Sequence, residues 1–281
     1  MKIHEYRITM PMTLDEYEVG LLFTLAQAHK RETGGGEGVV IVKNEPYDNF
    51  PLLHGKYSKG QYTYKIYHEE SKMPEFIRLV APPEALVAHE ESWNAYPYGK
   101  LIYSNPKYMK GNCWMEIDTF HTEDRGESEN VHELDSEELE SRSVIHIDIA
   151  NDPVDEKDYV EESDPTKFKS KKTGRGLLTG DWIVSTEPVM TAYIIVKVFL
   201  GGTLGTPLIA SQIENFAAKV QRRLFLNFYR NMFCSIDEWH GLTMEEIRVM
   251  EEETRLMLYE EINKGEKKPF GGIKSEAHEF E

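Results

Sequence analysis

The chain has 281 residues, 40% hydrophobic and 29% charged, which is long enough for one large domain or two small ones with a substantial core. Its formal net charge of −17 argues against non-specific binding to nucleic acid, which requires a basic surface. The N-terminus has no apolar h-region, so we expect no secretory signal, and the sequence has no apolar run near the roughly 20 residues that span a bilayer and no CxxC pair. We therefore expect a reduced, cytoplasmic protein with core thiols at Cys113 and Cys234.

The first predicted elements are a strand over residues 3–10 and an amphipathic helix over residues 14–31. Thr13 and Glu16 form a capping box at the start of this helix. The helix ends at the glycine-rich run 33–38. Because this run follows a helix, and does not open one after a strand, it predicts a flexible turn and not a phosphate-binding loop.

The middle of the chain is rich in short segments of β-branched and aromatic residues separated by turn residues, as is typical of strands. These segments are 39–43, 62–68, 76–80, 100–104, 113–121 and 144–149. In residues 60–68, alternation puts four side chains on one face: Gln61, Thr63, Lys65 and Tyr67. This face suits a polyhydroxylated, anionic group inside a concave sheet. The alternative is a solvated strand face with an ordinary surface lysine.

Two long segments without periodicity lie in the second half of the chain. Residues 123–140 are strongly acidic and predict a solvated loop or a short helix. Residues 151–172 begin acidic and end basic. A loop of this length inside a compact domain is usually functional or disordered.

The C-terminal half predicts a strand over 193–200 and two long helices, over 212–238 and 244–262. We expect capping boxes at Ser211–Glu214 and Thr243–Glu246 to open the two helices.

The order of these elements, strand and helix followed by antiparallel strands and long helices, is that of an α+β fold. Two long amphipathic helices could cover one face of the sheet and leave a cavity between sheet and helices. We expect residues 1–264 to form a single domain, and the polar residues 265–281 to form a disordered tail.

Motifs for catalysis are absent: the chain has no HExxH, no GxSxG and no P-loop. His121, His132 and His146, with Asp118 and Asp148 nearby in sequence, offer a metal or acid–base alternative. Histidines spaced in this way in strands and loops are more often structural. Nothing near either cysteine would lower the pKa of its thiol. We expect no enzymatic activity and no metal site.

Short sequence blocks occur in one order from near the N-terminus to about residue 258. The blocks are 5–7, 15–17, 32–38, 44–47, 60–63 (Gly-Gln-Tyr-Thr), 65–68, 93–98 (Trp-Asn-Ala-Tyr-Pro-Tyr), 129–132, 167–170, 172–176, 214–216, 222–225 and 250–254 (Met-Glu-Glu-Glu-Thr). Together they resemble the class I phosphatidylinositol transfer proteins.

This resemblance implies a single START-like helix-grip domain, in which a concave antiparallel sheet and the helices at 14–31 and 212–238 enclose one phospholipid. The helix at 244–262 would close the cavity. The implied function is non-enzymatic: the protein extracts phosphatidylinositol from one membrane, shields it and releases it to another, without a cofactor or nucleotide. Phosphatidylcholine is the usual second ligand of the family.

Two rival functions stay open at this stage. A lipid-presenting regulator would hand phosphatidylinositol to phosphoinositide kinases, and a lipid hydrolase would use the same cavity but lacks a nucleophile motif. We expect a monomer in the cytoplasm that visits membrane surfaces transiently, with the Golgi and the endoplasmic reticulum as candidate membranes.

In the family, the inositol ring is held by a threonine and a lysine of one strand, the asparagine of WNAYPY and the first glutamate of MEEET. The corresponding residues here are Thr63, Lys65, Asn94 and Glu251, which we call the headgroup quartet. Glu251 would accept hydrogen bonds from the ring hydroxyls, and Lys65 would donate to them and offset the charge of Glu251. Thr63 and Asn94 can both donate and accept.

The positions that the family uses near the lipid phosphate are altered. Gly99 stands where the family has a cysteine, and only Thr119 is retained. Leu21, Leu101 and Ile194 replace polar family residues. Inositol recognition is therefore supported, whereas the phosphate contacts must be partly rebuilt and binding of phosphatidylcholine is in doubt.

The membrane-docking loop at 200–204 lacks the adjacent tryptophans that are common in the family and suit a bilayer interface. We expect apolar side chains to supplement or replace that anchor: Phe50, Leu52, Leu53 and Leu204. The first three could instead pack onto the edge of the sheet.

Ser170 corresponds to a phosphorylation site of the family. Phosphorylation there would add about −1.5 to −2 charge to the loop. The lysines around Ser170 form either a contact for anionic membranes or a solvated loop.

Overall fold

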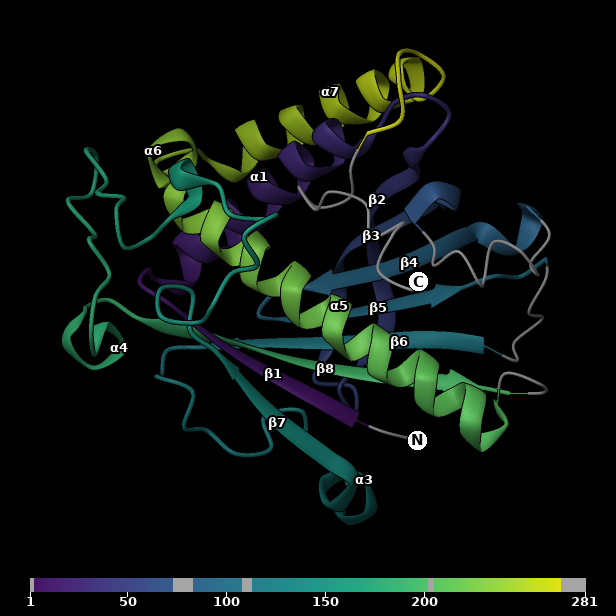
Figure 1. Cartoon of the computed structure of the whole chain (residues 1–281), viewed down its shortest axis with the longest axis horizontal. Coiled ribbons are helices and arrows are strands. Elements are labelled where there is room, and N and C mark those ends of the chain that lie inside the picture. Colours follow the sequence, from purple (N-terminus) through teal and green to yellow (C-terminus); the bar gives the residue numbers. More distant parts are fainter. Residues whose placement is uncertain (1–2, 73–82, 108–112, 202–204, 269–281) are drawn as a thin grey trace.

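The computed structural model describes residues 3–72, 83–107, 113–201 and 205–268 (Figure 1). Its strands are β1 (Ile3–Met10), β2 (Gly38–Leu52), β3 (Tyr57–His68), β4 (Val87–Ala95), β5 (Tyr98–Ser104), β6 (Cys113–Thr122), β7 (Arg142–Ile147) and β8 (Met190–Leu200). They form one eight-stranded sheet in the order β2-β3-β4-β5-β6-β8-β1-β7. Neighbouring strands are antiparallel except for β1 and β7, which are parallel. The α+β class is confirmed.

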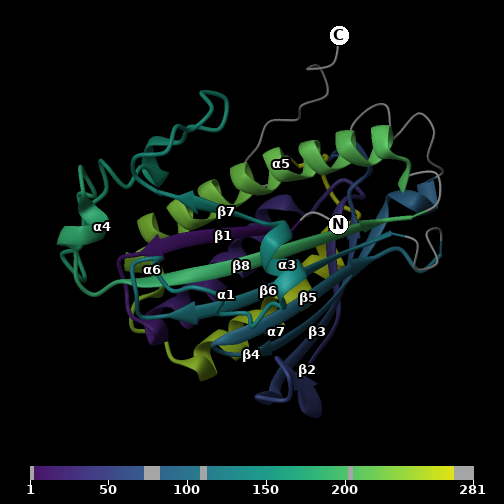
Figure 2. The same ribbon diagram turned by 90° about the horizontal axis from the view of Figure 1, so that it is seen from below.

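The α-helices are α1 (Leu14–Glu32), α3 (Ser136–Ser141), α4 (Trp182–Ser185), α5 (Pro207–Cys234), α6 (Ile236–Trp239) and α7 (Met244–Glu261). Short 3₁₀ helices lie at Glu70–Lys72, Pro83–Leu86 and Glu161–Ser163. The long helix α5 crosses the sheet over β6 and β8, and α7 packs against α1 and β2 (Figures 1 and 2). None of the helices in the described ranges combines the length and hydropathy that crossing a bilayer requires.

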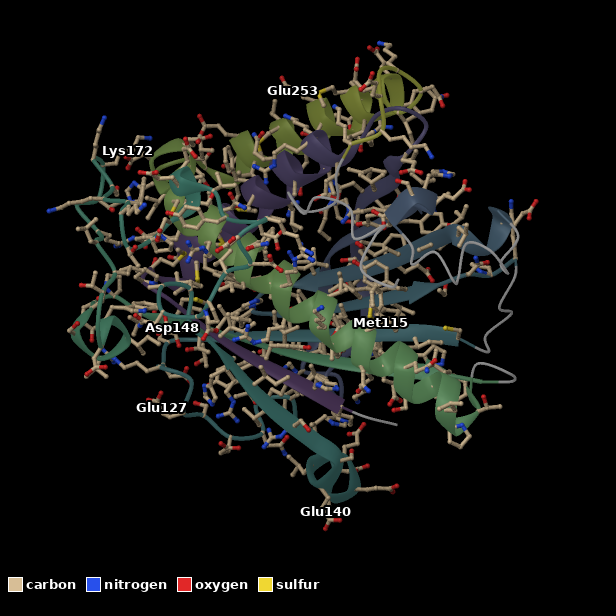
Figure 3. The ribbon with its side chains drawn as sticks, in the orientation of Figure 1. Met115, Glu127, Glu140, Asp148, Lys172 and Glu253 are labelled. Atoms are coloured by element: carbon tan, nitrogen blue, oxygen red, sulfur yellow. The ribbon has the colours of Figure 1, made fainter. Side chains whose placement is uncertain are left out.

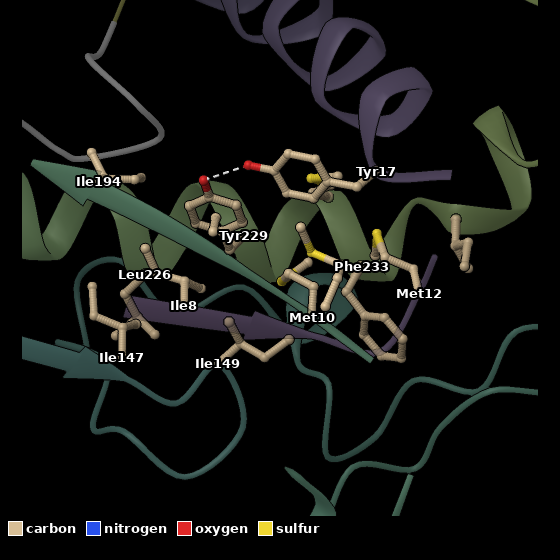
Figure 4. Packing of buried hydrophobic residues seen from close by; sticks show 14 of the residues in the cluster. Ile8, Met10, Met12, Tyr17, Ile147, Ile149, Ile194, Leu226, Tyr229 and Phe233 are labelled. Carbon is tan, nitrogen blue, oxygen red and sulfur yellow. Dashed lines mark hydrogen bonds between the residues drawn. The ribbon is translucent and has the colours of Figure 1, made fainter. Parts of the chain in front are cut away.

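The main core lies where β1, β7 and β8 meet α1 and α5 (Figure 4). Its members are almost all apolar because β1 and β8 are central strands with both faces covered. Two polar side chains enter this core together: the hydroxyls of Tyr17 on α1 and Tyr229 on α5 lie 2.8 Å apart and share a hydrogen bond. That bond satisfies both buried oxygens and joins the two helices across the core.

Two of the three predicted capping boxes are confirmed. The side chains of Thr13 and Thr243 each accept a hydrogen bond from the backbone of the third helical residue. The predicted box at Ser211 is wrong, because α5 already begins at Pro207 with Thr206 as its N-cap residue. Proline at the first helical position has a preset φ and needs no donor there, so it starts the helix before Ser211 is reached.

The expected helix over 212–238 ends at Cys234 and is followed by the separate short helix α6. The third predicted helix, over 244–262, agrees with α7 to within one residue.

The strand predictions hold for most of the sheet. Two differences are informative: β2 continues to Leu52 instead of ending at residue 43, and the whole of β4 was not predicted. Both segments carry polar residues, and β2 also contains Pro46, which is tolerated because β2 is an edge strand. The predicted strand over 76–80 lies outside the described residues.

The long loop after β7 is held against α5 by ion pairs. Arg222 contacts Asp152 at 2.7 Å, and Arg223 pairs with the buried carboxylate of Asp158. Two of the acidic residues in the first half of this loop, Asp152 and Asp158, therefore neutralise adjacent arginines of α5.

The glycine-rich run after α1 forms the predicted turn, and it contacts the far end of α7. The amides of Gly35 and Gly36 donate to the carbonyls of Lys264 and Ile262, and Lys267 pairs with Glu37 at 2.7 Å. A Cβ atom on Gly35, whose φ is 64°, would lie 2.2 Å from the backbone of Lys267, so this close approach requires glycine. Only residues 265–268 of the expected tail are described.

Candidate functional site

The two halves of the sheet differ in how completely they are buried. In β1 seven of the eight residues are buried, and in β8 the first seven of the 11 are, whereas none of the 12 residues of β3 is buried. Strands β4, β5 and β6 also keep many half-exposed positions on both faces. We call β3–β6 the open half of the sheet and β1 with β8 the closed half. The helices therefore do not fully cover the face of the open half that is turned toward them, which we call the inner face.

The face toward the helices is identified by contacts with α5. The sulfur of Met115 on β6 accepts a hydrogen bond from Gln221 of α5 at 3.3 Å, and Met115 is labelled beside that helix in Figure 3. In the sheet register, Met115 is opposite Tyr103, Tyr103 is opposite Glu90, and Glu90 is opposite Lys65. Directly opposite residues share a face, so Lys65 points to the inside.

The same register aligns the positions expected near the headgroup and the phosphate. One row crosses the inner face through Gln61, Asn94, Gly99, Thr119 and Ile194. The hydroxyl of Thr119 donates to the Gly99 carbonyl at 3.5 Å. A Cβ atom on Gly99 would lie 2.7 Å from that hydroxyl, so the side chain of Thr119 occupies the space that the missing side chain leaves.

Of the three consecutive glutamates at positions 251–253 on α7, only the first lies toward the inner face of the sheet. The side chain of Glu251 is 16% exposed, that of Glu252 is 56% exposed, and Glu253 is on the outer side of the helix (Figure 3). An oxygen of Glu251 reaches the side chain of Asn44 on β2.

Glu251 is held by two neighbours. Arg248, one helical turn earlier, approaches its Oε2 atom at 2.6 Å, and the amide nitrogen of Asn44 donates to the same oxygen at 3.4 Å. Asn44 also accepts hydrogen bonds from Gln61 at 2.7 Å and from Thr63 at 3.5 Å. The structure thus joins Thr63 and Glu251 of the quartet through Asn44.

Lys65 has a different partner from the expected one. Its ammonium group lies 2.9 Å from Glu90, and Glu251 is paired with Arg248. Burial alone would raise the pKa of Glu90, which is 1% exposed, but the charge of Lys65 and hydrogen bonds from Tyr103, Lys65 and Tyr67 together lower it. Glu90 therefore stays ionised and holds Lys65 as a buried ion pair on the inner face.

Sequence reasoning missed three polar residues of this site: Asn44, Glu90 and Arg248. Asn44 lies one residue beyond the predicted end of its strand, and Glu90 lies in the strand that was not predicted. Arg248 could have been found, because a residue three positions before Glu251 on a helix lies on the same face.

The candidate membrane residues that the structure describes pack against Trp93 and Ala95, which flank Asn94 and lie on the opposite face of β4. Leu52 is buried in a separate cluster with Ala95 and Tyr98, and Leu53 packs on it. Phe50 stacks on Trp93 with ring centres 4.6 Å apart, yet it remains 41% exposed. The structure favours packing at the sheet edge for Leu52 and Leu53 and leaves Phe50 as an exposed aromatic ring. Leu204 lies outside the described residues.

Ser170 is 2% exposed, and its hydroxyl donates to Asp237 at 2.5 Å. The backbone amides of Lys171 and Lys172 donate to the same carboxylate. The hydrogen bond from Ser170 is the largest contribution that lowers the pKa of Asp237. A phosphoryl group on Ser170 would therefore meet a negative charge, and a kinase would reach the hydroxyl only after this loop had opened.

Two residues of the histidine alternative, His121 and His132, are buried and each lies beside a backbone carbonyl. His121 contacts the carbonyl of Pro97, and His132 contacts the carbonyl of Tyr193. Burial lowers the pKa of both histidines to about 4, so each is neutral at pH 7. Among the described residues, no three histidine, cysteine or acidic side chains are grouped as metal ligands would be. Burial also raises the pKa of Cys234 to about 12, which makes it a poor nucleophile.

Comparison with known proteins covers almost the whole chain. The family described as phosphatidylinositol transfer protein matches residues 1–256. The phosphatidylinositol transfer protein beta isoforms of Rattus norvegicus and Homo sapiens are each 45% identical over 260 residues, covering 90% of this chain and 92% of each relative. Phosphatidylinositol transfer protein 2 of Dictyostelium discoideum is 41% identical over 263 residues, covering 92% of this chain and 95% of its own.

Proposed function

This chain belongs to the phosphatidylinositol transfer protein family, and from that membership we propose that it binds one phosphatidylinositol molecule between sheet and helices and carries it between membranes. The observation that supports this best is the incompletely covered inner face of β3–β6, on which Thr63, Lys65 and Asn94 lie. Glu251 reaches the same region from α7.

The acyl chains and the headgroup have separate roles in this proposal. Burying an acyl chain stabilises by about 0.8 kcal/mol per CH₂ relative to water, so the lipid must be shielded during transfer. In exchange with a bilayer this term nearly cancels, because the chains are dry in both places. Headgroup hydrogen bonds to charged residues, about 1.5–3 kcal/mol each, then decide which lipid is kept.

The charges of the site favour a neutral polyol. The charge of Lys65 is balanced by Glu90, and that of Glu251 is balanced by Arg248. Hydroxyl groups can donate to Glu251 and accept from Lys65 without adding a net charge. We propose that the inositol ring is bound by the headgroup quartet in this way.

Phosphatidylcholine should be the weaker ligand. Its choline has no hydroxyls for the quartet, and the row expected near the phosphate keeps Thr119 beside Gly99 and Ile194, which have no polar side chain. We also propose that the chain acts without catalysis, as a monomer in the cytoplasm, and that Phe50 contributes to transient membrane contact.

The test is native mass spectrometry with lipid extraction after incubation with phosphatidylcholine vesicles that contain phosphatidylinositol. Wild type should carry one phosphatidylinositol per chain. Glu251→Gln should lower the loading about ten- to a hundredfold, from the loss of one charged hydrogen bond. The matched control is Glu252→Gln, a neighbouring glutamate with an exposed side chain, and it should load normally.

A folded wild-type protein that stays empty would contradict the proposal. Slow transfer with strong stimulation of a phosphatidylinositol kinase would favour the lipid-presenting regulator instead.

A further inference from the structure

Strand β2 contains a register shift that decides which of its side chains face the site. Ile41 pairs with Lys65, but Lys43 pairs with Tyr64, so β2 carries one extra residue, Val42, at this point. A bulge of this kind re-aims the side chains that follow it.

The consequence of the bulge is the position of Asn44. Because of the extra residue, Asn44 is opposite Thr63 on the inner face, and Lys43 points outward with an exposed side chain. In a regular ladder from Ile41 onward, Lys43 would be opposite Thr63 instead. The bulge thus places a neutral amide, and not a second ammonium group, between β3 and α7.

The amide of Asn44 is oriented by its neighbours. Gln61 and Thr63 on β3 both donate to its Oδ1 atom, so its Nδ2 donor points to Glu251 on α7. Asn44 therefore connects two members of the headgroup quartet that come from different parts of the chain.

We propose that Asn44 is a positioning residue of the inositol site: it fixes Glu251 over Thr63 before the lipid arrives. Asn44 and Arg248 both contact Oε2 of Glu251, which directs Oε1 to the headgroup hydroxyls. Holding a binding group in place in advance raises affinity, because less freedom is lost on binding. This inference rests on the proposed function, since it assigns a role within the same site.

The experiment measures phosphatidylinositol loading from phosphatidylcholine vesicles that contain phosphatidylinositol. Asn44→Ala removes the contact and should lower loading about three- to tenfold, the size expected for one ordinary hydrogen bond. Asn44→Asp keeps the acceptor for Gln61 but puts a carboxylate against Glu251, so the loss should be larger. Lys43→Ala, on the opposite face of the same strand, is the matched control and should load like wild type.

A double-mutant cycle with Glu251→Gln distinguishes a role of Asn44 that acts through Glu251 from a merely structural one. If Asn44 acts through Glu251, the effect of Asn44→Ala should fall below about twofold in the Glu251→Gln background. Additive losses, or normal loading of Asn44→Ala, would overturn the inference. An empty wild-type protein would instead overturn the proposed function, so the two failures are distinguishable.

Discussion

The closed and open halves belong to one continuous sheet but differ in the side chains that they carry and in how completely these are buried. The closed half, β1 and β8, is sealed by apolar side chains of α1 and α5, with the paired hydroxyls of Tyr17 and Tyr229 inside. The open half, β3–β6, carries polar and charged residues on its inner face and is incompletely buried. The closed half therefore supplies apolar packing, while the open half leaves polar and charged groups incompletely covered.

The largest effect is expected for variants of the Lys65–Glu90 ion pair, which test whether stability and lipid binding can be separated in the open half. Lys65→Met leaves the buried carboxylate of Glu90 without its ion-pair partner, which should lower the free energy of unfolding by about 3–5 kcal/mol. Adding Glu90→Gln should restore most of that stability in urea titrations. Phosphatidylinositol loading should stay low in the double variant, because Lys65 is the proposed headgroup donor. Recovery of loading together with stability would show that Lys65 is only structural.

A second prediction concerns acid pH and the buried histidines His121 and His132. Both are neutral in the folded protein with pKa values of about 4, below the value of about 6.5 in an unfolded chain. Their contribution to stability is therefore complete above pH 6.5 and is lost as the pH falls toward 4. At pH 5 each of the two histidines should lower the free energy of unfolding by about 2 kcal/mol relative to its value above pH 6.5.

Urea titrations of the lipid-free protein at pH 7.5 and pH 5 measure this loss. His121→Gln should remove about half of the histidine contribution to the difference. An unchanged pH dependence in this variant would show that the acid sensitivity comes from other groups.

A matched pair of glycine substitutions compares the packing of the core under α1 with that of the open half. A Cβ atom on Gly20 of α1 would lie 2.9 Å from the buried side chains of Met232 and Trp239. Overpacking in Gly20→Ala should lower the free energy of unfolding by about 1–3 kcal/mol. The higher helix propensity of alanine should offset up to about 1 kcal/mol of this loss. In Gly99→Ala the close neighbour is the Thr119 hydroxyl, which can rotate, so the cost should be below about 1 kcal/mol. Equal costs would contradict the difference in packing.

The smallest expected effect on stability is at Phe50. Because Phe50 is stacked on Trp93 but largely exposed, Phe50→Ser should cost at most about 1 kcal/mol in thermal unfolding. Sedimentation with phosphatidylcholine vesicles should show weaker membrane binding. Leu52→Ser is the comparison variant, since Leu52 is buried and its replacement should mainly destabilise the fold. Unchanged vesicle binding of Phe50→Ser would remove Phe50 from the membrane contact.

The sequence alone was sufficient for features that depend on short-range periodicity. The capping boxes at Thr13 and Thr243 were read from residues three positions apart. The alternation of β3 placed Thr63 and Lys65 on one face, which is the inner face of the folded sheet. These inferences succeed because a capping box and the alternation of a strand depend on residues close together in the chain. The same reasoning failed at Ser211, where Pro207 starts the helix earlier.

Only the tertiary structure decided which groups meet. The partner of Lys65 is Glu90 on β4, which was not predicted as a strand because of its polar residues. Asn44 faces Glu251 because of a one-residue bulge in β2. Ser170 is buried against Asp237, which lies 67 residues away in the chain. Such contacts depend on strand register and on the docking of distant helices, and a shift of one residue reverses every face. Sequence patterns therefore predicted the strand that carries Thr63 and Lys65 and the face they share, whereas the fold determined the charge partner of Lys65.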